Sequence, residues 1–310
     1  MLLDLHTSLS LRNSGSRRIR GITLLVSAQD VTPGGKASVS VPSLNAAPGD
    51  NFPIRIDLRL LRPLQAENGP LVEIGLDGVL FDDLSFFGPN RLNSRRSMTV
   101  WEMEARRDRQ YFRQVLESRG REALKAEMLA SLDHQADRSV MDARVAQSGR
   151  STISRNERQI QVAFLETPSA PVFASDGLVR IADNEARSPR LYVKNTTSRP
   201  VRALEMGWLV KDERGREFVA GSIPVDVSLA PGQKTTLVQD VTFKFSQSSG
   251  EPIGIADMKA FVSSVEFSDG KMWVPERSVK MPTPSPEEQR LTALYRKKGL
   301  EALVDELKRF

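Results

Sequence analysis

The feature that most constrains how this chain can fold is an internal repeat, in which motifs of the first half recur in the same order in the second. The segment LRNSGSRRIR at 11–20 aligns with VKNTTSRPVR at 193–202, and RGREAL at 119–124 aligns with KGLEAL at 298–303. Between these segments a Pro-Gly pair and a Val-x-Phe motif also recur in register. Each match is short, but a shared order of matches is typical of repeated units. We infer a tandem duplication.

The repeat divides the chain into two domains and a connector. The copies span residues 1–133 and 172–310, and a polar connector covers 134–171. Both copies have the size of an ordinary domain, roughly 100–200 residues. Hydrophobic residues make up 39% of the chain, which is enough to form packed cores. Because no run approaches the ~20 apolar residues of a membrane-spanning helix, the sequence predicts no transmembrane segment.

Most of each copy carries the alternating pattern of β-strands. Leu204, Met206 and Trp208 occupy every second position, which is the period of a half-buried strand. Other short apolar runs follow at roughly ten-residue spacing, with turn residues between them. This arrangement predicts a β-sandwich. In its overall pattern the chain is similar to the immunoglobulin-like and fibronectin-type modules of bacterial envelope proteins, a resemblance at the level of fold.

The apolar phase changes within one predicted strand of each copy, at corresponding places. In the first copy Ile74 and Leu76 give way to Val79, and in the second copy Val262 gives way to Val265. One extra residue in a strand, a β-bulge, turns the following side chains to the other face. The sequence therefore predicts a bulge, or a strand that switches sheets, near the same point of both copies.

Each copy ends in a segment with helical periodicity. Residues 101–132 carry apolar side chains at spacings of three and four. Near the other end, Ser285 followed by Pro286 is typical of a helix N-cap and first helical position. Gly120 and Gly299 interrupt the two segments at aligned positions. The expected fold class is mainly β with helical tails: tandem immunoglobulin-like or fibronectin-like β-sandwich repeats, each followed by a helix-Gly-helix segment.

The first copy lacks a counterpart for one strand of the second. The segment GLVRIAD at 177–183 predicts an additional first strand, and by the repeat register its equivalent lies before Met1. We therefore expect the first sandwich to lack an edge strand. Residues 162–165 or another segment could fill that place, or the chain as given begins too late to include it. No signal peptide is visible, but an upstream start would leave room for one, and we expect an exported protein.

The residue inventory excludes several kinds of chemistry. The chain has no cysteine and only two histidines, so disulfides, zinc–thiolate sites, iron–sulfur clusters and thiol nucleophiles are excluded. Asp82, Asp83 and Asp269 lie near turns, where aspartate commonly bonds the turn backbone, and this interpretation is favoured over calcium binding. We expect no catalytic residue, no metal site and no cofactor, and hence no enzyme.

One arginine-rich stretch is the best candidate for a contact surface. Net charge is +5, and arginines cluster around the predicted first helix. With Trp101 and Tyr111 among them, they could contact phosphates and stack on bases. Acidic residues interrupt the stretch, however, and Glu102 and Arg106 are four apart, which favours a salt-bridged helix surface. The candidate contact residues are Arg95, Arg96, Arg106, Arg107, Arg109 and Arg113.

Taken together, these patterns predict a non-catalytic binding or scaffolding protein of the bacterial cell envelope, built from two duplicated β-sandwich modules. The expected partner is another protein, because sandwiches offer edge strands and loops for protein contacts. The expected location is periplasmic or extracellular. The alternative is a cytoplasmic protein with a basic helix that binds nucleic acid or an acidic partner.

Overall fold

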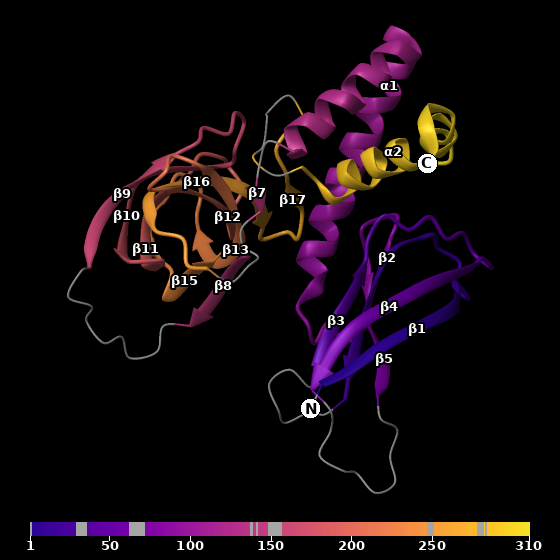
Figure 1. The fold of residues 1–310 in the computed structure, drawn as a ribbon, viewed down its shortest axis with the longest axis horizontal. Coiled ribbons are helices and arrows are strands. Elements are labelled where there is room, and N and C mark those ends of the chain that lie inside the picture. Colours follow the sequence, from indigo (N-terminus) through magenta and orange to yellow (C-terminus); the bar gives the residue numbers. More distant parts are fainter. Residues whose placement is uncertain are drawn as a thin grey trace, which may run out of the picture. The chain divides into compact units, whose positions relative to one another are not determined.

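The computed structural model describes residues 2–28, 36–61, 72–136, 139–140, 142–147, 157–246, 251–277, 282 and 284–310. Within those residues strands dominate, and the helices are α1 (Ser94–Ala136) and α2 (Pro286–Lys308) (Figure 1). The chain is therefore mainly β with several sheets, as the alternating pattern predicts.

The chain forms two compact units, and they do not follow the expected division exactly. One unit combines Met1–Ser118 with Ser285–Phe310, and the other is Arg119–Pro284. The C-terminal helix thus belongs to the first unit, whereas the repeat places it with residues 172–310. Residues 139–140, 142–147 and 158–164 of the expected connector form strands paired within the second unit, while residues 148–156 at its polar centre lie outside the described residues.

The first unit contains two small sheets. Its strands are β1 (Leu2–Arg12), β2 (Ile19–Ser27), β3 (Lys36–Val41), β4 (Asn51–Leu61), β5 (Glu73–Phe81) and β6 (Phe86–Phe87). Strand β1 pairs with β4 along its whole length, and the other sheet has the order β3-β2-β5-β6. Alternate residues of both sheets, among them Leu24, Val26 and Ile54, form one apolar core.

The second unit contains a larger, more continuous sheet. Its strands are β7 (Ser139–Val140), β8 (Asp142–Gln147), β9 (Arg158–Phe164), β10 (Val172–Ala182), β11 (Glu185–Asn195), β12 (Val201–Asp212), β13 (Glu217–Leu229), β14 (Lys234–Val238), β15 (Val241–Ser246), β16 (Ile255–Phe267) and β17 (Met272–Trp273). Strand β9 pairs with both β10 and β16, so it joins the two faces of the unit. Figure 1 shows these strands curving around a common interior.

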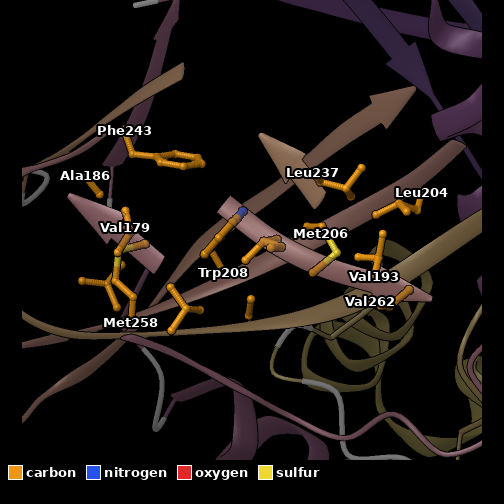
Figure 2. Close-up of a cluster of buried hydrophobic side chains, with 14 of the residues drawn as sticks. Val179, Ala186, Val193, Leu204, Met206, Trp208, Leu237, Phe243, Met258 and Val262 are labelled. Atoms are coloured by element: carbon orange, nitrogen blue, oxygen red, sulfur yellow. The ribbon is translucent and has the colours of Figure 1, made fainter. Parts of the chain in front are cut away.

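The interior of the second unit is filled by side chains from both faces. Trp208 on β12 is fully buried and packs against Phe243 on β15, with ring centroids 5.5 Å apart. Figure 2 shows Val179 of β10 projecting into the same cluster, which also holds Met258 of β16. The predicted strand at Leu204–Val210 is confirmed, and its inward residues form the centre of this core.

The bulges predicted from the phase changes are confirmed in both units. The pairing of β2 with β5 skips Asp77, and the pairing of β12 with β16 skips Ser263. The first bulge turns Asp77 inward, where its carboxylate accepts the backbone N–H groups of Arg91 at 2.7 Å and Leu92 at 3.2 Å. The extra residue therefore ties β5 to the loop that leads into α1.

Local signals explain how the helices begin and bend. Ser285 caps α2 and accepts the backbone N–H of Glu288 at 3.0 Å, with Pro286 following it, as predicted. Within α1 and α2 the backbone is non-helical at Gly120 (φ 83°, ψ −176°) and Gly299 (φ 81°, ψ −175°). Only glycine adopts this region readily, because a Cβ would be strained there.

No described helix is long and apolar enough to cross a bilayer.

Candidate functional site

An apolar groove of about 560 Å³ lies beside β1 and β5 on the first unit. Its walls come from strands of both sheets, so it opens directly onto the apolar core. The lining residues include Leu9, Leu11, Leu24, Phe52, Ile74, Leu76, Val79, Phe81 and Phe87. A volume of this size falls within the ~300–1,000 Å³ range typical of binding pockets.

The groove exposes side chains that the strand pattern directs inward. Leu9 and Leu11 alternate with Ser8, Ser10 and other exposed polar residues on β1, yet they are only half-buried. Leu76 is 47% exposed and Phe87 is 63% exposed. Large exposed apolar side chains gathered around one opening are typical of a site that contacts another molecule.

The place in the second unit that the predicted repeat aligns with this groove is filled. Strand β10 pairs with β11 on one side, and β9 joins β10 to β16 on the other. Leu191 and Val193 of β11 are 0% and 2% exposed. Val262 of β16 is 4% exposed. In the described residues of the first unit, no strand pairs with the second edge of β1.

The segment 162–165 does not fill the open place in the first unit. Residues Arg158–Phe164 form β9, and Val162 pairs with Gly177 in the second unit. Leu165 donates its backbone N–H to the carbonyl of Ala260, also in that unit. Of the ways proposed from sequence to complete the first sandwich, this one is wrong, because β16 and β10 already hold the segment.

One end of the groove is polar. The guanidinium of Arg17 lies 3.8 Å from the centroid of the Phe81 ring and 3.4 Å from the carboxylate of Asp83. Hydrogen bonds from the side chain and backbone of Ser85 hold the pKa of Asp83 below its ordinary value. Arg17 therefore sits between the groove and a turn aspartate.

Two of the three aspartates singled out from the sequence accept hydrogen bonds from the backbone of their own turns. Asp83 accepts the backbone N–H of Ser85 at 2.9 Å, and Asp269 accepts that of Lys271 at 3.1 Å. Among the described residues no group of three or more His, Cys, Asp or Glu side chains could hold a metal ion.

The candidate contact arginines divide into different environments. Arg109 is only 3% exposed and lies between Glu102, at 3.2 Å, and Glu287 of α2, at 3.3 Å. Arg106 donates to Glu102 at 2.8 Å, which confirms the predicted pairing four residues apart. Arg107 contacts Asp108 at 2.9 Å. These ion pairs lie within the first unit, so the basic side chains in this part of α1 serve mainly to stabilise that unit.

The other three candidate arginines also lie on α1. Arg95 and Arg96 occupy its first turn, and Arg113 lies further along; all are partly exposed. The structure thus groups Arg106 and Arg109 around one glutamate and leaves the other members of the set along the helix. A basic contact surface made by all six stays a prediction.

Sequence reasoning did not anticipate the buried cluster that α2 forms with α1. Arg290 donates to Glu287 at 2.8 Å and to Glu306 at 2.6 Å. The ring of Phe310 lies 4.2 Å from the guanidinium of Arg109 and 5.6 Å from that of Arg290. Arg109 is separated from Glu287 by 178 positions in the sequence, and spacing within either helix gives no sign that the two helices meet.

Burial and charge act against each other at Glu287. Its side chain is fully buried, which raises the pKa, but the hydrogen bond and charge of Arg290 outweigh that effect. The side chain of Ser43 and the charge of Arg109 act in the same direction, so the pKa lies below its ordinary value of 4.5. Glu287 is therefore a buried carboxylate held in its charged form, with the role of linking α2 to α1.

Comparisons with known proteins assign no family. No protein-family model matches the chain, and no curated protein matches it. Among solved structures, a hypothetical protein from Peptoclostridium difficile 630 is 14% identical, with coverage of 40% of this chain and 92% of that one and a TM-score of 0.25. A β-glucosidase from Kluyveromyces marxianus is 9% identical, with coverage of 85% and 45% and a TM-score of 0.19. These TM-scores are too low to indicate a shared fold.

Proposed function

We propose that this chain is a non-catalytic binding or scaffolding protein of the bacterial cell envelope, built from two duplicated β-sandwich modules of immunoglobulin-like or fibronectin-like type. Each module is followed by a helix-Gly-helix segment. The groove of the first module is its binding face, and another protein is its partner.

Matching local geometry supports the duplication. Asn13 and Asn195 are both buried, and each side chain donates to a carbonyl four residues ahead, at 2.8 Å in both units. Arg17 lies 3.8 Å from the ring of Phe81, and Arg199 lies 3.7 Å from that of Phe267. The strand bulges and the non-helical glycines recur as well. Unrelated domains have no reason to share all of these details at aligned positions.

The observation that carries the binding function is the exposure around the groove. Leu76 and Phe87 are about half or more exposed, although both lie beside an apolar core. Burial of apolar surface contributes about 25 cal/mol per Å², so an exposed cluster of this kind is stabilised by a partner that covers it. An envelope scaffold uses such surfaces for protein contacts.

Photo-crosslinking tests this function in cells that naturally produce the protein. A benzophenone amino acid at Leu76 is expected to give one reproducible adduct, identified by mass spectrometry as the same segment of one protein in each replicate. The matched control places the same group at Leu129, which is 46% exposed on α1. Absence of an adduct at Leu76, or the same adducts from both positions, would contradict the proposal.

The envelope location is tested separately by cell fractionation and intact mass. The proposal expects the native protein in the envelope fraction. Recovery only from the cytoplasm, at the 34.5 kDa of this chain, would contradict the location and favour the alternative partners.

A further inference from the structure

In the second unit, a strand occupies the place that corresponds to the unpaired edge of β1. Strand β10 lies antiparallel to β11, with Val172 opposite Asn195 and Ala182 opposite Glu185. Its inward residues are almost fully buried: Val172 and Val179 are each 1% exposed, and Ile181 is 2% exposed. Figure 2 shows Val179 reaching the central cluster of that unit. An extended strand with small aliphatic side chains at alternate positions thus completes the core.

The strand next to β10 closes the remaining side. In β9, Val162 is 4% exposed and pairs with Gly177, while Ala163 and Phe164 pair with β16. The pairing with β16 falls at Lys259 and Ala260, just before the bulge. Both edges of the core, one on β11 and one on β16, are therefore bridged by extended chain.

In the first unit the two corresponding edges are not bridged by any described strand. Strand β1 corresponds to β11 in the repeat. Asn13 comes directly after β1, and the aligned Asn195 is the last residue of β11. Its described pairing is with β4 alone. Strand β5 pairs with β6 at Val79 and Leu80, after its bulge, while the stretch at Ile74 lines the groove.

The strands that border the two places have the same length. Strands β1 and β11 are each 11 residues long, and so is β10. Leu9 and Leu11 of β1 are half-buried. They align with Leu191 and Val193 of β11, which β10 covers. An edge strand with one unpaired side and an adjoining apolar groove is the arrangement used in recognition by strand addition, where backbone bonds give affinity and alternate pockets give specificity.

We propose that the groove binds an extended segment of another polypeptide, which adds to the free edge of β1 as an antiparallel strand. The segment has aliphatic residues at alternate positions, like Val179 and Ile181 of β10, and polar residues between them, like Arg180. These aliphatic side chains enter the groove beside Leu76. This inference rests on the proposed binding function and specifies the chemistry of the partner.

A peptide with the sequence of residues 171–183 is the probe. It carries a terminal fluorescent label and is titrated with the full chain by fluorescence polarisation. Saturable binding is expected. A control peptide with Val179→Lys and Ile181→Lys is expected to bind at least tenfold more weakly, because its inward positions are charged.

Matched protein variants locate the binding to the groove. Leu76→Arg is expected to weaken binding of the probe at least tenfold, whereas Leu129→Arg, at a similarly exposed position, leaves binding unchanged. Hydrogen exchange adds a second measurement: the amides of β1 should become protected when the peptide binds. No saturable binding, or equal binding by the Leu76→Arg variant, would overturn the inference.

The two proposals fail in different ways. A specific adduct at Leu76 in cells with no peptide binding would leave the groove as a binding face but reject an added strand. Peptide binding lost in the Leu76→Arg variant, without any adduct in cells, would support the added strand and reject the cellular binding role.

Discussion

Leu76 and Val262 occupy the same register position in their respective units but differ sharply in exposure. Leu76 pairs with Leu24 across β5 and β2, and Val262 pairs with Met206 across β16 and β12. Leu76 is 47% exposed, whereas Val262 is 4% exposed. The difference follows from β9 and β10, which cover the second unit and have no described equivalent in the first.

Alanine substitutions at these positions should have unequal effects on stability. Val262→Ala removes buried methyl groups and leaves a cavity, so it should lower the free energy of unfolding by about 2 kcal/mol. Leu76→Ala removes exposed surface and should change that free energy by less than about 0.5 kcal/mol. Urea unfolding measures both, and a loss at Leu76 as large as at Val262 would count against an open groove.

The buried asparagines should be equally important to their own units. Asn13 donates to the carbonyls of Arg17 and Ala46, at 2.8 and 3.0 Å. The side chain of Asn195 donates to backbone carbonyls of its own unit in the same way. Asn13→Ala or Asn195→Ala leaves backbone carbonyls without a donor and should lower the free energy of unfolding by about 3 kcal/mol. The exposed Asn51→Ala is the control and should have little effect. A marked loss from only one of the buried substitutions, measured by urea unfolding, would argue against equivalent loops.

The ion cluster between α1 and α2 should depend strongly on Glu287. Glu287→Gln leaves Arg109 and Arg290 with reduced charge compensation in a buried setting, and should lower the free energy of unfolding by about 3 kcal/mol. The control, Asp269→Asn, alters an exposed pair with Arg199 and should leave stability nearly unchanged. Thermal or urea unfolding tests this, and equal effects of the two substitutions would contradict a structural role for the cluster.

Acid should weaken the same cluster. The pKa of Glu287 is lower in the folded chain than its ordinary value of 4.5. Its stabilising contribution is therefore complete above that value and is lost as pH falls through the lowered pKa. The stability gap between the native chain and Glu287→Gln should narrow on acidification from pH ~7 toward ~3. Urea unfolding at several pH values measures the gap, and a gap that stays constant would show that this carboxylate does not titrate as described.

Much of the strand and helix structure could be predicted, because it depends on local pattern. Alternation at Leu204–Val210 marks a strand, and the Ser285-Pro286 pair marks a helix start; both depend only on neighbouring residues. The bulges at Asp77 and Ser263 were predictable because one extra residue reverses which side chains face inward.

The parts that could not be predicted depend on contacts between distant segments. Nothing near Glu287 shows that it meets Arg109, so the return of α2 to the first unit was missed. The pairing of β9 with β16 is parallel and joins segments about a hundred residues apart, and no local pattern specifies it. The predicted repeat gave the second copy a first strand with no aligned counterpart in the first, and this signal could have pointed to the groove, but the alignment alone does not give the exposure of Leu76 or Phe87.

Thiol reactivity tests the central claim, an open groove in the first unit, most directly. The chain has no cysteine, so Leu76→Cys and Val262→Cys each introduce a single thiol at equivalent register positions. The Leu76→Cys thiol should react with a disulfide reagent nearly as fast as in the unfolded chain, and the Val262→Cys thiol at least a hundredfold more slowly without denaturant. Comparable protection of the two thiols in the folded protein would show that the groove is already covered and would contradict the account.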